Sequence, residues 1–440
     1  MLDEHDQQVP LQTVQSWAAA RGRNRLSFVA DLPPLGYRVY RVRPPAAVPA
    51  AGNGAQAPVQ VHSAQLTDDQ YRASATTLEN RWHRLEFDPE TGYIRSLIDK
   101  ALGVEMFRAP AAKPAVIEDR SDTWGHEVTS FNNVIGAFTA TSVTLVAHGP
   151  VKSVIRVSSS YGSSKLVQDF TLYRELPQID VHVMLDWNEE WKLLKLQFPL
   201  NLNFIKATYE IPYGHIERPT NGEEEPGQSW VDASGLVRDS QQLYGLALLN
   251  DGKYSFDMQR KVLSMTVLRS PVYAHHDPFM PPPDAQYVFM DQGVQHFTYT
   301  MVPHAGGWEG AGVVKRAAEL NQRPVTVIET YHEHGQLPQH DSFITVDQDN
   351  VLVSAVKKAE NNDDLIVRCY ETTRVQTTAT ISLPHWNRTI QAVFAPCEIK
   401  TFRVPQDQTR PIVENNLLEW TLDQANSASN GQVLHEQAPA

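Results

Sequence analysis

The segment Ile-Asp-Val-His-Val-Met-Leu-Asp-Trp, residues 179–187, has the clearest structural pattern in the sequence. Its apolar side chains occupy every second position from Ile179 to Trp187, and Asp180, His182 and Asp186 fall between them. Successive side chains of a β-strand point to opposite faces, so this alternation predicts a strand with one buried face. A strand of this kind is typical of a β-sandwich.

The same pattern extends outward from this strand in both directions. Residues 79–100, ENRWHRLEFDPETGYIRSLIDK, place an Asp-Pro-Glu-Thr-Gly turn between two alternating arms, which predicts a β-hairpin. Short strands bounded by turns continue to about residue 300, and the 29 prolines and 23 glycines agree with a turn-rich β protein. Only residues 308–321, WEGAGVVKRAAELN, predict an amphipathic helix, with Val313, Ala317 and Leu320 on its apolar face.

Changes of composition along the chain predict its domain organisation. A length of 440 residues suits two or three domains, because single cores rarely grow beyond roughly 250 to 300 residues. The Ala-, Pro- and Gly-rich stretch after residue 43 resembles a linker, and the polar segment after Trp420 has little to bury. We therefore expect the end of a small β-domain at 1–43, a linker at 44–65, a large β-domain at 66–330, a small terminal β-sandwich at 331–420 and a disordered tail at 421–440.

Charge and cysteine content exclude several classes of partner and site. With 51 acidic and 38 basic residues the net charge is −13, which argues against a nucleic-acid backbone or an anionic membrane as the main partner. Cys369 and Cys397 are too few for a disulfide framework or a cysteine-based zinc site, although one disulfide between them stays open. No secretion signal and no run of 18 apolar residues occurs, so we expect a cytoplasmic protein.

A first candidate binding segment is Asp119–Glu127, DRSDTWGHE, which combines acids, a tryptophan and a histidine in a loop-like setting. Aromatic faces stack on sugar rings while polar groups bond their hydroxyls, so Trp124 and His126 are candidates for the edge of a carbohydrate site. The alternative is a buried tryptophan beside a histidine that bonds within the fold.

A second candidate segment is LRSPVYAHHDP, residues 268–278. Arg269 is a candidate clamp for sugar hydroxyls, and Tyr273, His275, His276 and Asp277 would border a polar cleft; the alternative is a proline-stiffened surface loop. We expect no metal site here, because adjacent histidines in an extended segment point to opposite faces.

Two further features have simple structural alternatives. His304, after the strand HFTYTMV, would place an imidazole at a strand end near the substrate, or would serve as a structural cap. The acidic run Glu223–Glu225 is interpreted as a solvated loop. No phosphate-binding Gly-rich loop with a following lysine, no Gly-x-Ser-x-Gly elbow and no His-Glu-x-x-His motif occurs, so nucleotide, serine-hydrolase and zincin functions have no support.

Many short phrases together resemble one enzyme family. LPPLGYRVYRV, LENRWHRLEFDPETGYIRSLIDK, DRSDTWGHEV, EIPYGHIERPT, YGLALLNDGKY, LRSPVYAHHDP, HFTYTMVPHAGGW, VLVSAVKKAENNDDLIVRCYE and NNLLEW occur in this order between about residues 26 and 420. In phrase and order they resemble the C-terminal half of α-mannosidases of glycoside hydrolase family 38, of the cytosolic and bacterial type.

The resemblance implies a mainly β fold, a large galactose-mutarotase-like supersandwich followed by a smaller β-sandwich. It also implies a retaining, zinc-dependent enzyme that acts on mannose-containing glycans through a covalent intermediate. In that family an N-terminal β/α domain holds the zinc and the Asp nucleophile. Its N-terminal His-x-Asp motif and its His-His-Asp-Ala segment are absent here, and His275-His276-Asp277-Pro278 is in the wrong context to be the latter. We therefore expect no catalytic and no metal-binding residue in this chain, inactivity of the chain alone, and docking to an N-terminal catalytic domain or a partner chain.

Two other functions stay open from the sequence. One is a non-catalytic carbohydrate-binding or scaffold module that packs against another polypeptide. The other is an aldose epimerase, which rests on analogy of fold alone and requires a histidine and a glutamate that converge on the concave face of one sheet.

Overall fold

The computed structural model describes residues 1–14, 25–43, 70–238, 240–274, 282, 284–329 and 335–421. The predicted linker at 44–65 and all but the first residue of the predicted tail at 421–440 lie outside these residues. The domain boundaries drawn from composition therefore stay predictions.

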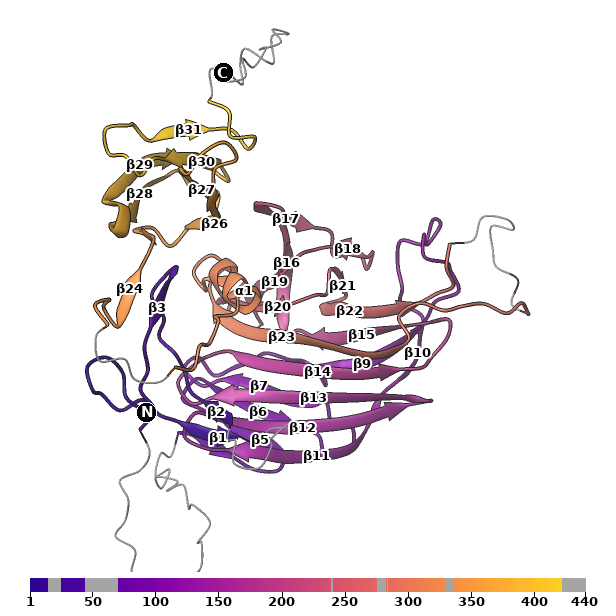
Figure 1. The fold of residues 1–440 in the computed structure, drawn as a ribbon. Coiled ribbons are helices and arrows are strands. Elements are labelled where there is room, and N and C mark those ends of the chain that lie inside the picture. Colours follow the sequence, from indigo (N-terminus) through magenta and orange to yellow (C-terminus); the bar gives the residue numbers. More distant parts are fainter. Residues whose placement is uncertain are drawn as a thin grey trace, which may run out of the picture.

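A nine-stranded antiparallel sheet forms the centre of the molecule (Figure 1). Its spatial order is β11-β12-β13-β14-β23-β20-β19-β16-β17, so strands distant in sequence lie side by side. The strands are β11 Thr139–His148, β12 Lys152–Tyr161, β13 Ser164–Tyr173, β14 Ile179–Trp187, β16 Leu202–Ile211, β17 Gly214–Arg218, β19 Trp230–Val237, β20 Leu243–Asn250 and β23 Gly293–Ala305.

Two smaller sheets cover one face of this sheet. The six-stranded sheet has the order β10-β9-β15-β22-β21-β18, and the five-stranded sheet runs from β4 to β8 in sequence order. Their strands are β4 Arg72–Ala73, β5 Thr77–Glu79, β6 His83–Phe87, β7 Ile94–Asp99, β8 Val104–Glu105, β9 Lys113–Glu118, β10 Val134–Ala137, β15 Lys192–Pro199, β18 Glu225–Pro226, β21 Ser255–Gln259 and β22 Val262–Ser270. One continuous apolar core lies between the layers, and all three sheets contribute to it.

The pattern at residues 179–187 is confirmed as a strand. β14 spans Ile179–Trp187, and its five odd-numbered side chains are buried. The hairpin is confirmed as well, since β6 pairs with β7 across the turn that contains Asp88 and Gly92. Asp88 Oδ1 accepts the backbone N–H groups of Glu90 and Thr91, which holds this turn.

The predicted helix exists but begins later than the sequence pattern indicated. Helix α1 spans Val313–Asn321, and Val313 and Ala317 pack with Trp230 and Trp308 on the outer face of the nine-stranded sheet. Residues 308–312 instead form turns that end at Gly312, whose φ is +63°. Glycine adopts positive φ without strain, so the helix starts after it.

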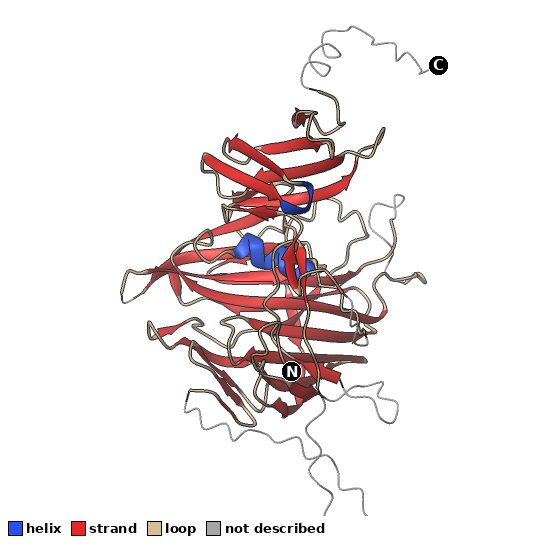
Figure 2. Cartoon of the chain, turned by 60° about the vertical axis from the view of Figure 1, so that its left-hand side comes forward, coloured by secondary structure: helices blue, strands red, loops and turns tan. Residues whose placement is uncertain are grey.

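A small sandwich of strands follows (Figure 2). It has its own apolar core. It consists of the sheets β25-β28-β29 and β26-β27-β30-β31, with a 3₁₀ turn η1 at Pro384–Trp386. Its strands are β25 Thr345–Val346, β26 Val351–Lys358, β27 Leu365–Glu371, β28 Thr377–Leu383, β29 Arg388–Phe394, β30 Ile399–Val404 and β31 Val413–Asn415. The prediction of a mainly β chain with a large sandwich before a smaller one is confirmed.

The N-terminal segment connects both sandwiches. Strands β1 Gln12–Val14 and β2 Arg25–Ser27 pair with each other, and the Gln12 side chain accepts the N–H groups of Val151 and Lys152 from the large sandwich. Strand β3 Gly36–Arg38 pairs with β24 His340–Ser342, which leads into the small sandwich. In the described part of the chain, no helix is long and apolar enough to cross a membrane.

Candidate functional site

Arg269, near the end of β22, is the centre of a polar cluster at one edge of the six-stranded sheet. Its Nε and Nη2 atoms donate to the two carboxylate oxygens of Asp119, at 2.9 and 3.3 Å, and Nη2 also donates to Ser121 Oγ at 2.6 Å. The guanidinium lies over the Phe131 ring, 4.5 Å from its centroid. Asp119 is buried, so this pair is a bidentate, charge-assisted contact shielded from water on one side.

These contacts change the role that the sequence indicated for Arg269. Two of its three nitrogens hold the loop that follows β9, and therefore they are not available as a clamp for sugar hydroxyls. Nη1 has no hydrogen-bond partner among the described residues, and a Cβ added at Gly125 would lie 3.9 Å from it. Arg269 is thus first a positioning residue, with one N–H₂ group left for a ligand.

Asp122 organises the loop that carries the two aromatic candidates. Its Oδ1 atom accepts the N–H groups of Trp124 at 2.9 Å and Gly125 at 3.1 Å, and Oδ2 lies 3.2 Å from His126 Nε2. The Asp122 side chain is fully buried, whereas 55% of Trp124 is exposed. The loop therefore displays the indole at the surface, with the imidazole edge-on to it at 5.7 Å between ring centroids.

Residues 268–274, the described part of the second candidate segment, lie at the same edge of the six-stranded sheet. Val272 forms a parallel bridge with Asp122, and Tyr273, which follows it, is 57% exposed. His275, His276 and Asp277 lie outside the described residues. Trp124, His126, Arg269 and Tyr273 therefore lie at one edge of the sheet, although 150 residues separate Asp119 from Arg269 in sequence.

A cavity of about 190 Å³ lies beside this loop. Its walls are residues 118–122, 126, 128 and 130–133. Arg120 donates to Glu118 at 2.6 Å, and this hydrogen bond is the main reason that the pKa of Glu118 falls below its ordinary value. The cavity thus has an ionised carboxylate at its rim and the Phe131 ring in its wall, a combination that suits a polyhydroxylated ring.

His304 does not join this cluster. It lies in β23 of the nine-stranded sheet, where its Nε2 atom is 2.8 Å from Asp232 Oδ1 and Ser234 Oγ donates to Asp232 Oδ2 at 2.6 Å. His304 and Asp232 are both buried. This arrangement matches the structural alternative that the sequence left open for His304 rather than the substrate edge.

The acidic run is a clear correction, because Glu224 is not solvated. Glu224 and Asp257 both form ion pairs with Lys195, which is only 2% exposed in the middle of β15. Ser255 and Thr266 donate to Glu224 Oε2 at 2.5 and 3.0 Å. Burial raises the pKa of Asp257 to about 6, against the opposing effect of the Lys195 ammonium.

This buried triad is coupled to the surface loop through the backbone. Glu224 N donates to Thr129 O at 2.8 Å, in the same loop that carries Asp122 and Phe131. Of the three consecutive glutamates only Glu223 is exposed, and Glu225 pairs with Arg218 at 3.1 Å. A lysine inside the apolar run Leu193–Phe198 was the available signal for the triad, whereas no sequence pattern indicated Phe131.

Within the described residues, no three His, Cys, Asp or Glu side chains come close enough to hold a metal ion. Asp122 and His126 supply two potential ligands only, and a structural zinc site needs four. The residues described here therefore do not fit a zinc site, and we derive no metal-dependent step from them.

Comparisons with known proteins show which family this chain is similar to. The family model "Glycosyl hydrolases family 38 C-terminal domain" matches residues 78–286, and "Glycosyl hydrolases family 38 C-terminal beta sandwich domain" matches residues 350–394. Alpha-mannosidase G of Dictyostelium discoideum is 27% identical over 64% of this chain, and alpha-mannosidase 2C1 of Homo sapiens is 29% identical over 68%. The chain spans only about a quarter of these relatives, 26% and 28% of their lengths.

Solved structures show the same fold. A glycosyl hydrolase family 38 protein from Enterococcus faecalis superposes with a TM-score of 0.67 at 16% identity, over 92% of this chain and 52% of that one. An alpha-mannosidase from Enterococcus faecalis V583 superposes with a TM-score of 0.62 over 76% of this chain and 43% of that one. The two family models match in order and together cover more than half of the sequence. The chain belongs to glycosyl hydrolase family 38, of which it carries the C-terminal β-sandwich region.

Proposed function

We propose that this chain is the C-terminal part of a retaining α-mannosidase and forms one wall of the groove that receives a terminal mannoside of a glycan. One observation carries the proposal: the loop held by Arg269, Asp119 and Asp122 lies inside the matched region at residues 78–286 and displays Trp124 at the surface. An exposed indole on a rigid loop is suited to stack on the apolar face of a sugar ring.

The carboxylates of this loop support positioning rather than bond cleavage. A retaining glycosidase needs two carboxyl groups roughly 5 Å apart, one as nucleophile and one as acid and base. Asp119 accepts hydrogen bonds from Arg269 and Ser121, and Asp122 accepts two backbone N–H groups. Both are therefore committed to the loop, and we assign nucleophile and zinc to the N-terminal domain that the family resemblance implies.

An activity assay tests this division of labour. The purified chain is incubated with an aryl α-mannoside, with and without added zinc, and then together with a separately produced N-terminal part of a family 38 relative. We expect no turnover by the chain alone in either condition and turnover by the combination. Robust hydrolysis by the chain alone would overturn the proposal.

We further propose that the protein works in a reducing, cytoplasmic environment. Cys369 and Cys397 are both unpaired, so the disulfide that the sequence left open does not form. Burial raises the pKa of Cys369 to about 12, which leaves its thiol protonated and unreactive at neutral pH. Two free thiols and no disulfide are typical of proteins that fold where glutathione keeps cysteines reduced.

A further inference from the structure

A second cavity, of about 400 Å³, lies at the far end of β15 from the Arg269 loop. Lys192, at the start of β15, pairs with Glu118 beside that loop, and Leu200 follows the strand's last residue, Pro199. Eight residues of strand separate the two places by about 26 Å. The cavity is lined by Arg108, Leu200, Asn201, Asn203, Arg238 and Lys261.

The lining is cationic and contains no carboxylate. Within the described residues, the Arg108 and Arg238 guanidinium groups donate no hydrogen bond and form no ion pair, and both residues are exposed. Lys261 Nζ donates only to the neutral Asn203 Oδ1, at 2.5 Å. Among the residues that the structure describes, three positive charges therefore line one cavity that has no carboxylate in its wall, in a chain whose net charge is −13.

An unfavourable turn places Lys261 at this cavity. Gln259 pairs directly with Val262, so Arg260 and Lys261 form a two-residue turn between β21 and β22. Their φ angles are +47° and +70°, and turns of this kind strongly favour Asn and Gly. Leu200 N donates to Lys261 O at 2.8 Å, which ties the turn to the cavity floor. Backbone strain of this kind is concentrated at binding sites, where a particular side chain is needed.

A bulge at the start of β16 positions the amide that holds this lysine. The pairing of β16 with β19 shifts between Asn203 and Lys206, and Phe204 in the bulge has a φ of +51°. A Cβ added at Gly235 would come within 2.5 Å of Asn203 O, so the close approach of the two strands requires glycine there. Bulges commonly redirect a side chain beside a functional site.

We propose that this cavity binds the phosphomonoester of a small organic molecule. Guanidinium groups match phosphate oxygens with paired N–H donors, and three cations exceed what a single carboxylate requires. The volume falls in the range of roughly 300 to 1,000 Å³ that is usual for small-molecule sites, so the ester's organic part occupies space that inorganic phosphate leaves empty. The cations surround one cavity and do not form an extended stripe, which disfavours a nucleic-acid backbone.

Isothermal titration calorimetry on the 440-residue chain tests the proposal with three probes: glucose 6-phosphate, inorganic phosphate and glucose. We expect glucose 6-phosphate to bind, inorganic phosphate to bind at least about tenfold more weakly, and glucose to give no heat. Added sodium chloride should weaken the binding of the ester, because the contact is ionic and solvent-accessible.

Variants assign the binding to this cavity. Arg108→Gln and Arg238→Gln should each weaken glucose 6-phosphate binding by about tenfold or more, because each removes a charged donor. Neither side chain has a hydrogen-bond or ion-pair partner in the described part of the chain, so the melting temperature without ligand should stay unchanged. Lys165→Gln, an exposed lysine on β13, is the matched control and should bind like the wild type. The proposal is overturned if the ester does not bind, if all three variants lose affinity equally, or if inorganic phosphate binds as tightly as the ester.

Discussion

At the scale of single residues, the charged side chains that stabilise the fold are buried, whereas their charged neighbours in sequence are exposed. Asp119 and Arg120 are adjacent, yet Asp119 is fully enclosed while 76% of the Arg120 side chain is exposed. A charged pair is worth most where water is excluded and where both partners have fixed geometry. The loop that carries Trp124 and His126 therefore depends on Asp119 far more than on Arg120.

Asp119→Asn should lower the free energy of unfolding by about 2 kcal/mol, because it weakens a bidentate contact and leaves the Arg269 guanidinium without its counter-charge. Urea denaturation followed by tryptophan fluorescence measures this change. Arg120→Gln is the matched control, and an exposed pair of this kind should change stability by less than about 0.5 kcal/mol. Equal effects of the two substitutions would contradict the assignment of Asp119 as the organiser of the loop.

Lys195→Met should cost about 3 to 5 kcal/mol at pH 7, because Glu224 and Asp257 then remain buried as two carboxylates without a cation. The loss should shrink as the pH falls. Burial already places the pKa of Asp257 at about 6, above its ordinary 3.8, and removal of the lysine raises it further. When the pKa of a carboxyl group is higher in the folded chain than in the unfolded chain, the group stabilises the folded chain at low pH. This stability is lost as the pH rises through the folded-state pKa.

Denaturant titrations of wild type and Lys195→Met at pH 5 and pH 7 check this dependence. Lys192→Met, three residues earlier on the same strand and only partly buried, serves as the control. A pH-independent loss in Lys195→Met would show that packing, and not charge, explains the effect.

His83 should reduce stability on the acid side. Burial lowers its pKa below the ordinary 6.5, with Asp99 and the carbonyl of Pro177 opposing the shift. Below pH 6.5 the unfolded chain therefore takes up a proton that the folded chain excludes, and stability falls by at most about 1.4 kcal/mol per pH unit. His83→Phe should reduce this slope between pH 6.5 and 5, to the part that His148 and His215 cause through their own lowered pKa values, while the exposed His340→Phe should leave it unchanged. The free energy of unfolding, measured between pH 6.5 and 5 for the wild type and both variants, tests this expectation.

At the scale of strands and helices, the sequence patterns predicted the features that depend on residues close together in the chain. β14 was predicted to the residue because one of its faces is buried along its whole length. The helix began five residues later than its pattern, because the apolar contact of Trp308 is made from a turn and not from the helix. The pairing of β9 with β15 and of β15 with β22 had no local signal, so the sequence identified Trp124 and Arg269 separately but not the contact between their segments.

The turn between β21 and β22 allows a test of strain at this scale. Arg260 has a φ of +47°, is exposed, and does not line the cavity. Arg260→Asn should therefore raise the free energy of unfolding by about 0.5 to 1 kcal/mol, since asparagine tolerates this conformation better. Arg238→Asn, at an exposed residue without positive φ, should leave stability within about 0.5 kcal/mol of the wild type. Urea denaturation of both variants measures the difference; no gain in Arg260→Asn would mean that the turn is not strained.

At the scale of the whole molecule, two separate apolar cores suggest two separate unfolding units. The core of the large sandwich and that of the small sandwich have no buried residue in common. Contacts between them include the Tyr213 and Tyr370 rings, 5.2 Å apart, and the bond from Arg374 Nη2 to His215 O at 2.8 Å. Such limited contact favours independent unfolding of the two parts.

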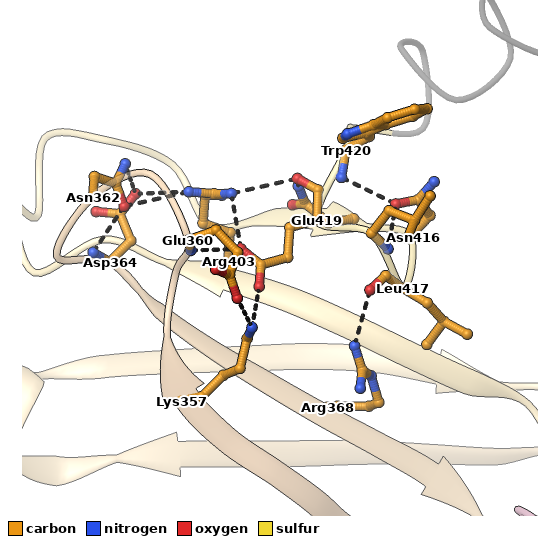
Figure 3. Close-up of polar contacts among 12 residues, drawn as sticks. Lys357, Glu360, Asn362, Asp364, Arg368, Arg403, Asn416, Leu417, Glu419 and Trp420 are labelled. Atoms are coloured by element: carbon orange, nitrogen blue, oxygen red, sulfur yellow. Dashed lines mark hydrogen bonds and ion pairs between the residues drawn. The ribbon is translucent and has the colours of Figure 1, made fainter.

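The turn at residues 416–420 follows β31, and substitutions in it should change the stability of the small sandwich alone (Figure 3). Glu419 is 8% exposed and accepts from Glu360 N at 3.0 Å, while Lys357 Nζ and Arg403 Nη2 lie 2.8 and 3.5 Å from its carboxylate. The turn thereby fastens the segment after β31 onto strands β26 and β30. Glu360 shares Lys357 with Glu419, but 71% of its side chain is exposed, so it provides a matched control.

Differential scanning calorimetry should accordingly resolve two transitions. Glu419→Ala should lower one of them by about 10 °C, since the loss of a buried acceptor with three partners costs about 2 kcal/mol in a unit of this size. The other transition should stay in place and should respond instead to Lys195→Met, because Lys195 lies in the large sandwich. Glu360→Ala should move neither by more than a few degrees. A single transition that shifts as a whole in every variant would show that the two sandwiches unfold as one cooperative unit.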